Sequence, residues 1–266
     1  REWLAQAALM QGVWERLGRP AGSIGGWCDA LVAELCAAGV LALQVFFIGR
    51  IALMVVLDPG STAFQRTEAW RLASGGTLRW RQDWRDYGDI SDHLKRAVIA
   101  SEDDGFVNHE GVNWEAVEKA WERNAQAEEA AAQRAAQNRP ARPIKIRGGS
   151  TITQQLAKNL LLSGERTLLR KGQELVLTYA LENLLSKRRI LEIYLNEVEW
   201  GEGVFGAEAA AQHYFRKNAA QLTPWEAARL AVMLPRPRYF EKLPRSRYLA
   251  HRTGTIVARM RGAELP

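Results

Sequence analysis

The stretch EDDGFVNHEG, residues 102–111, closes an amphipathic helix and opens a turn, and the rest of the chain is organised around it. Leu94 and Val98 recur at helical spacing after Ser91, a typical N-cap, so Glu102 falls in the last helical turn. A carboxylate there opposes the negative end of the helix dipole and tends toward a raised pKa, which suits a general base. A solvated loop with an Asp-Gly turn is the alternative.

The net charge of the chain lies beyond its first 57 residues. The 266 residues carry a net charge of +6, and residues 1–57 are neutral in total, so residues 58–266 hold the whole excess. Such a basic region expects an anionic partner: nucleic acid, phosphate or a membrane surface. Because no cysteine follows Cys36, and 47% of the residues are hydrophobic, the chain can bury a sizeable core without disulfides.

An apolar run, LCAAGVLALQVFFIGRIALMVVL, occupies residues 35–57. At about 1.5 Å per residue it can cross a hydrocarbon layer of about 30 Å, so we interpret it as an uncleaved membrane span after a cytoplasmic segment, residues 1–34. Arg50 is costly within a bilayer, although it lies close enough to one end to reach partway to the interface. The alternatives are a buried core helix or a cleaved signal peptide, but no small-x-small cleavage site follows the run. Flanking charges do not decide the orientation.

Aromatic and basic residues alternate soon after this run. Trp80 and Trp84 alternate with Arg79, Arg81 and Arg85, and this period of two suggests one exposed strand or extended arm. Stacking on a nucleic acid is the alternative use of such an arm. Beside a membrane span, we expect no nucleic-acid partner, and aromatic side chains in this region favour the membrane interface.

The stretch GGSTITQQLAKN, residues 148–159, begins a second informative helix. Thr151 and Gln154 have the spacing of a capping box. Ile152 and Leu156 lie on one side of the helical wheel, whereas amides, a hydroxyl and a single lysine share the other side. A polar face with so little charge, at the positive end of a helix, suits a sugar and a phosphate. A capped surface helix is the alternative.

A third helix, predicted over residues 167–186, gathers its charged residues on one face. Arg170, Lys171, Glu174 and Glu182 fall within about a third of its circumference. A surface ion pair between Arg170 and Glu174 would explain part of this pattern equally well.

The remaining pattern is helical. Further helices are predicted over residues 61–72, 114–138, 190–198, 207–215, 224–234 and 249–260, with almost no strand pattern, and Thr223 with Glu226 has the spacing of a capping box. The basic run at residues 187–189 is expected to complement a helix C-terminus unless it faces lipid. We therefore expect a mainly α fold with one catalytic domain, residues 58–266, behind a membrane anchor. The four histidines are isolated, so no metal-ligand spacing is present.

Five stretches in this order resemble the glycosyltransferase domain of peptidoglycan synthases. They are EDDGFVNHEG (102–111), GGSTITQQLAKN (148–159), RKGQE with its trailing ALE (170–182), KRRILEIYLNEVEWGEGVFGAEAAAQHYF (187–215) and TPWEAARLAVMLPRP (223–237). The layout is most similar to the monofunctional biosynthetic transglycosylases. An Ala-rich segment near residues 124–143 departs from the family by its length. The resemblance implies a lysozyme-like glycosyltransferase domain with a small membrane-associated lobe.

The resemblance also implies an activity and a location. Enzymes of this family polymerise lipid II into β-1,4-linked glycan strands and release undecaprenyl pyrophosphate. The implied partners are lipid II, the nascent glycan strand, membrane lipids and proteins of the division or elongation machinery. The implied location is the bacterial inner membrane, with a single span and a periplasmic catalytic domain. No cofactor is required by the pattern, although a divalent cation, Mg²⁺ or Mn²⁺, is compatible with the pyrophosphate.

The family pattern assigns roles to residues of this chain. Glu102 matches the general base that takes the proton of the acceptor 4-hydroxyl, and Glu174 matches a second glutamate that orients cations or assists a divalent ion. The cations expected at the departing pyrophosphate are Lys158, Arg166, Arg170 and Lys171. The residues expected to hold the sugar and phosphate are Thr151, Gln155 and Asn159, and those expected to shape the cleft are Asp103, Phe106 and His109.

Two other functions compete with this assignment. A catalytically inactive, lipid II-binding scaffold would keep the fold but would not need both acids and Lys158. A lysozyme-like lytic enzyme would also use one glutamate, but it would not need four cations converging on a phosphate.

Overall fold

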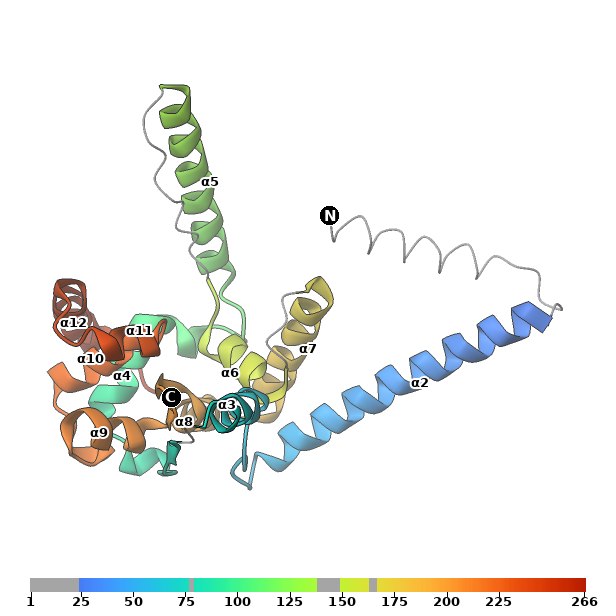
Figure 1. Cartoon of the computed structure of the whole chain (residues 1–266), viewed down its shortest axis with the longest axis horizontal. Coiled ribbons are helices and arrows are strands. Elements are labelled where there is room, and N and C mark those ends of the chain that lie inside the picture. The colour runs from blue at the N-terminus through green and yellow to red at the C-terminus, as the bar shows by residue number, and fades with distance from the viewer. Residues whose placement is uncertain (1–23, 77–78, 138–148, 163–166) are drawn as a thin grey trace. The chain divides into compact units, whose positions relative to one another are not determined.

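The computed structural model describes residues 24–76, 79–137, 149–162 and 167–266. The chain divides into two compact units, Arg1–Arg50 and Ile51–Pro266. The mainly α class expected from the sequence is confirmed, since helices dominate the described residues (Figure 1).

The long N-terminal helix is α2 (Ile24–Leu53), within which Cys28–Leu53 is long and apolar enough to cross a membrane. The helix begins earlier than the apolar run at residue 35, because helix formation needs no apolarity and residues 24–34 contain no proline. It also ends at Leu53, before the run ends at residue 57. The Arg50 guanidinium lies over the Phe46 ring, 5.9 Å from its centroid.

The second unit holds the remaining helices. They are α3 (Ala63–Ser74), α4 (Asp92–Glu102), α5 (Trp114–Ala136), α6 (Ile152–Leu161), α7 (Leu168–Leu184), α8 (Lys187–Glu197), α9 (Ala207–Phe215), α10 (Pro224–Met233), α11 (Pro237–Lys242) and α12 (Arg247–Arg259), with short 3-10 turns at Tyr87–Asp89, Phe106–Asn108, Ala219–Gln221 and Met260–Gly262. The predicted caps are confirmed, since Ser91, Thr151 and Thr223 each accept a backbone N–H at the start of a helix.

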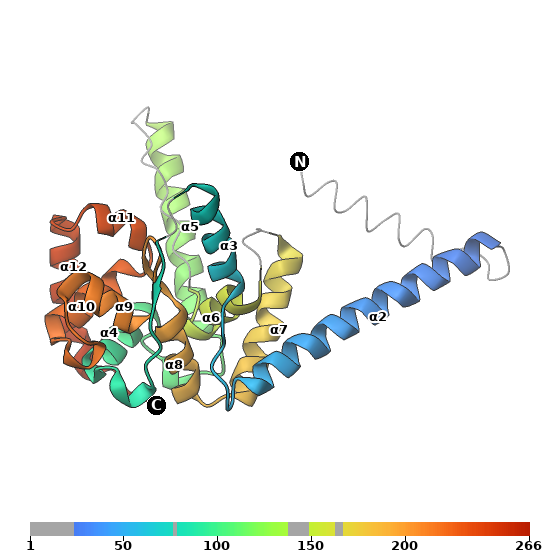
Figure 2. The same cartoon turned by 60° about the horizontal axis from the view of Figure 1, so that its bottom comes forward.

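The helices of the second unit pack in two groups. On one side, α10 packs against α4 and α12, and on the other side α6 packs against α3, α7 and α8 (Figures 1 and 2). Leu94, Leu156 and Ile190 are fully buried and belong to the core between these helices. This packing brings the C-terminal end of α4 to the N-terminal end of α6.

A small three-stranded sheet joins segments far apart in the sequence. Its strands are β1 (Arg81–Gln82), β2 (Glu199–Gly201) and β3 (Val204–Phe205), in the order β1-β3-β2, with β1 parallel and β2 antiparallel to β3. The arm that contains β1 is less exposed than expected. Trp80 stacks on Phe205 with 4.4 Å between ring centroids, and Trp84 is half-buried. Contacts within the protein therefore shield both side chains in part from solvent.

The basic run at residues 187–189 has two separate roles in the structure. Arg189 donates hydrogen bonds to the carbonyls of Met54 and Leu57 and pairs with Asp58 at 2.8 Å, so it ties the segment just after α2 to α8. Lys187, by contrast, turns toward the stretch at residues 102–111. The sequence led us to expect that this basic run complements the end of a helix. Arg189 does so, since the carbonyls that it binds follow α2, but Lys187 does not.

Candidate active site

The end of α4 places Glu102 at a cavity. Asp103 leaves the helical conformation, and the turn that follows ends α4 directly after Glu102. A cavity of about 380 Å³ opens beside Glu102, between the end of α4, the first turns of α5 and the residues that precede α6. Arg259 of α12 also lines it and pairs with Asp104 at 2.9 Å. The cavity is large enough to admit part of a sugar ring.

Two neighbouring side chains hold the Glu102 carboxyl. The Gln155 amide donates a hydrogen bond to Oε2 at 3.1 Å, and the Ser101 hydroxyl donates to Oε1 at 3.3 Å. Burial raises the pKa of Glu102, against the lowering effect of these two hydrogen bonds, and the neighbouring Asp103 raises it further. The raised pKa expected from the sequence is therefore found, but burial is its main cause rather than the helix end.

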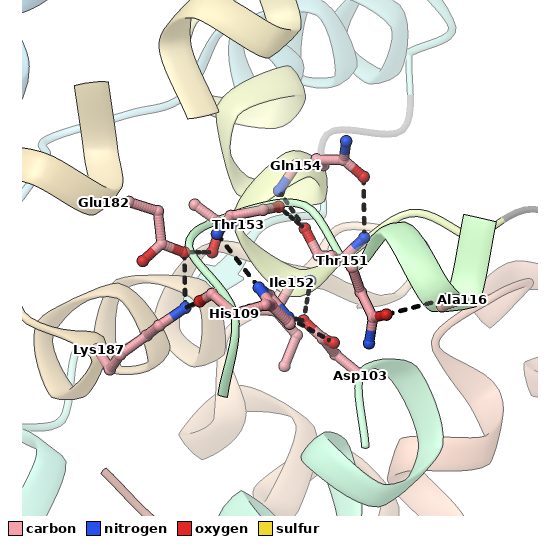
Figure 3. A network of polar contacts seen from close by, with 11 residues as sticks. Asp103, His109, Ala116, Thr151, Ile152, Thr153, Gln154, Glu182 and Lys187 are labelled. Carbon is pink, nitrogen blue, oxygen red and sulfur yellow. Dashed lines mark hydrogen bonds and ion pairs between the residues drawn. The ribbon is translucent and has the colours of Figure 1, made fainter. Parts of the chain in front are cut away.

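Asp103 fixes the turn after α4 to the start of α6. Its buried carboxylate accepts a backbone hydrogen bond from Ile152 at 3.0 Å and contacts His109 Nε2 at 2.9 Å (Figure 3). The backbone N–H of Gly111 points at His109 Nδ1, at 3.2 Å, so we assign the ring proton to Nε2, which donates to Asp103. Asp103 and His109 thus bind each other and the main chain in this structure.

Thr151 joins the same framework through its hydroxyl. As the N-cap of α6, the hydroxyl accepts a hydrogen bond from the backbone N–H of Gln154, and it donates to the Gly111 carbonyl at 2.6 Å. Gly111 has a φ of +87°, and a Cβ there would lie 2.7 Å from Thr178, so a side chain would be both strained and crowded. The expected contact of Thr151 with substrate stays a prediction, and in this structure its hydroxyl proton and one of its two lone pairs are used within the protein.

An ion pair that the sequence did not assign to the site braces this loop from the other side. Lys187 donates to the His109 carbonyl at 2.6 Å and pairs with Glu182 at 2.8 Å, while the Thr153 hydroxyl donates to the same Glu182 oxygen at 2.6 Å (Figure 3). The Lys187 ammonium also lies 4.6 Å from the centroid of the buried Phe106 ring. Helices α6, α7 and α8 therefore all hold the stretch at residues 102–111.

The cations predicted at the pyrophosphate are partly brought together by Glu174. This buried carboxylate binds Arg170 at 3.1 Å and Lys171 at 2.5 Å, one turn away on α7. The packing of α6 on α7 brings the helix that carries Lys158 and Asn159 against the helix that carries this group. Arg166 lies outside the described residues. Among the described residues, no three histidine, cysteine or acidic side chains gather as a metal site.

Two residues that the sequence did not single out act on the site from distant positions in the chain. Tyr194 of α8 donates to the Gln155 side chain, and Arg252 of α12 lowers the pKa of Glu102 electrostatically. Neither had a local signal, because Tyr194 follows Gln155 by 39 residues and Arg252 lies still further along the chain. Glu182 did have one, since it shares the polar face of α7 with Arg170 and Glu174.

Comparison with known proteins points to one family. The family model described as Transglycosylase matches residues 72–261. A protein of Burkholderia thailandensis named "Biosynthetic peptidoglycan transglycosylase" is 52% identical over 238 residues, which cover 89% of this chain and 87% of the relative. Relatives with the same name from Burkholderia pseudomallei and Paraburkholderia phytofirmans are 51% and 50% identical, and cover 89% and 85% of this chain and 87% and 88% of their own lengths.

Proposed function

Because the chain belongs to the transglycosylase family and is a peptidoglycan glycosyltransferase of cell-wall synthesis, we propose that Glu102 is the general base of its glycosyl transfer. Glu102 would take the proton from the 4-hydroxyl of the acceptor sugar as that oxygen attacks the donor. The position of the Glu102 carboxyl supports this role. The carboxyl lines an open cavity, and the burial of the rest of its surroundings raises its pKa. A base with a raised pKa accepts a proton more readily at neutral pH.

The leaving group would be stabilised by the cations around Glu174. As the acceptor oxygen bonds to the anomeric carbon, the bond from that carbon to the pyrophosphate breaks and negative charge develops on the departing oxygen. Arg170 and Lys171 are held by Glu174, and about half of the Lys171 side chain is exposed, so its ammonium can reach a phosphate oxygen. Lys158 and Arg166 would complete this group, as the family pattern implies.

We propose a single displacement with inversion. The donor linkage in lipid II is α and the product linkage is β, so one attack from the opposite face accounts for the stereochemistry. No covalent enzyme intermediate is then needed, and the proton ends on Glu102. The second glutamate, Glu174, would act through the cations it orients rather than on the sugar.

A divalent cation, Mg²⁺ or Mn²⁺, would have to be held chiefly by the pyrophosphate itself. Both oxygens of Glu174 are bound by Arg170 and Lys171, so this carboxylate does not present a free ligand set. The described residues near the cations therefore do not fit a site in which the protein supplies the ligands.

We further propose that α2 is a single membrane span in the bacterial inner membrane and that the catalytic unit lies on the periplasmic side. The length and apolar composition of Cys28–Leu53 support the span, and a lipid-linked substrate supports a position at the membrane surface. Membrane lipids and proteins of the division or elongation machinery are proposed partners on the same basis.

The activity can be tested with the purified full-length chain and lipid II. We expect glycan polymers that a muramidase digests, and we expect Glu102→Gln to abolish polymerisation while lipid II binding persists. An inactive wild-type chain that still binds lipid II would favour the scaffold. Cleavage of existing glycan strands would instead favour a lytic enzyme.

A further inference from the structure

Tyr194 is a buried polar residue that the proposed mechanism does not use. It lies on α8, within the sequence KRRILEIYLNE, and only 1% of its surface is exposed. Its hydroxyl donates a hydrogen bond to Gln155 Oε1 at 3.0 Å. A phenol in such surroundings needs a polar partner, and Tyr194 finds that partner in a residue that touches Glu102.

The Gln155 amide transmits this contact to Glu102. An amide has one accepting end and one donating end, so fixing its oxygen on Tyr194 turns its nitrogen toward Glu102. That nitrogen donates to Glu102 Oε2 at 3.1 Å, a bond that favours the ionised carboxylate. With the opposite amide orientation, two oxygens would face each other, and only protonated Glu102 could form a hydrogen bond.

Tyr194 is suited to act as a constant donor. Burial raises its pKa well above the usual value, and the carboxylates of Glu102 and Asp103 raise it further. The hydroxyl therefore keeps its proton throughout the range in which Glu102 titrates. A histidine or a water molecule at this point would not hold one fixed hydrogen-bond direction.

We propose that Tyr194 is a positioning residue for glycosyl transfer, which acts through Gln155 to orient the Glu102 carboxylate and keep it ionised. The inference rests on the proposed role of Glu102 as the base. It extends that role to a three-residue chain that runs from α8 through α6 to the end of α4. Tyr194 itself does not reach the substrate.

The primary test is Tyr194→Phe in the full-length protein, with lipid II polymerisation measured across pH. Loss of one buried hydrogen bond should lower kcat about tenfold and leave KM within about twofold. Because the amide can then reverse, the acid limb of the kcat/KM profile should move upward by about half a pH unit or more. The acid limb should move to higher pH because the loss of a hydrogen bond that favours the carboxylate raises the pKa of Glu102.

Other charges near Glu102 stay in place in this variant. They come from the end of α4, from α5 and from α12, and comprise Asp103, Asp104, Lys119, Arg123, Arg252 and Arg259. A shift of the acid limb between the wild type and Tyr194→Phe therefore reports the relay from Tyr194 through Gln155 to Glu102 rather than these groups.

Tyr214→Phe provides a matched control. The Tyr214 hydroxyl also donates a hydrogen bond inside the protein, to the Trp200 carbonyl at 2.8 Å, but among the described residues no hydrogen bond joins it to Glu102 or Gln155. Its removal should cost comparable stability without moving the acid limb. An equal shift in both variants would overturn the inference, because the effect would then be a general loss of stability.

A second pair of variants tests whether Tyr194 acts through Gln155. In a Gln155→Ala background, adding Tyr194→Phe should lower kcat by less than about twofold, because the intermediate residue is already gone. A full additional loss, or a Tyr194→Phe profile identical to that of the wild type, would contradict the relay. If Glu102→Gln kept full activity, the role of Glu102 as the base would itself be refuted. If Glu102→Gln were inactive but the pH profile of Tyr194→Phe did not shift, only the role of Tyr194 would be refuted.

Discussion

Glu197 offers the most quantitative prediction from the structure. It is the last residue of α8, only 2% exposed, and its Oε2 accepts a long hydrogen bond of 3.4 Å from Gln82. The other oxygen has no hydrogen-bond partner among the described residues, and no cation pairs with the carboxyl there. Burial raises its pKa from 4.5 to about 7, against the lowering effect of the nearby Gln65 and Gln82 amides, of which Gln65 donates to the Glu197 main-chain carbonyl.

This difference makes the stability of the fold depend on pH. The folded protein holds the Glu197 proton more tightly than the unfolded chain does. Protonated Glu197 therefore makes its full contribution to the free energy of unfolding below pH 4.5. It is lost as pH rises toward about 7, and the loss amounts to about 3 kcal/mol. Glu197→Gln removes the ionisation and should therefore stabilise the protein at high pH but hardly at low pH.

The assay is thermal unfolding of the full-length protein in detergent, followed by tryptophan fluorescence. At about pH 8, Glu197→Gln should raise Tm by about 5–10 °C relative to the wild type, and at about pH 5 by much less. Glu118→Gln, at an exposed position on α5, serves as the control and should show no such difference. A Tm gain that is equal at both pH values, or larger at about pH 5, would refute the reasoning.

Three further substitutions probe the framework of the site. Asp103→Asn should lower stability by about 1.5–3 kcal/mol and reduce polymerisation, because the amide places an NH2 donor where a carboxylate oxygen now accepts from Ile152 or His109; unchanged Tm and activity would contradict its bracing role. Lys187→Met should cost about 3–5 kcal/mol in denaturant unfolding, since Glu182 stays buried without its cation, and a loss under 1 kcal/mol would count against the brace. Glu174→Gln should lower kcat/KM for lipid II by about tenfold or more, because Arg170 and Lys171 lose their shared anchor; wild-type kinetics would show that the anchor is dispensable.

Local patterns predicted most of the helices and the separate parts of the site. Ser91, Thr151 and Thr223 identified helix starts because a cap depends only on residues within one turn. Glu102 could be singled out in the same way, since its place at a helix end is local. The raised pKa was expected correctly, but the burial that causes it depends on tertiary packing.

Contacts between distant segments could not be predicted in this way. β1 pairs Arg81 with Val204, and strands of two or three residues are too short to show alternation. Tyr194 looked like an ordinary core residue because its hydroxyl partner lies on another helix. The second role of Thr151, its bond to the Gly111 carbonyl, likewise appears only when α6 meets the stretch at residues 102–111.

The role of Glu102 as the base of glycosyl transfer decides the proposed mechanism. It is tested most directly by the single-turnover rate of Glu102→Gln at saturating lipid II, measured together with the dissociation constant for lipid II. We expect the rate to fall by about 10²-fold or more, the usual contribution of a general base, while the dissociation constant stays within about twofold. A rate within about threefold of the wild type would contradict the account, because another group would then have to accept the proton.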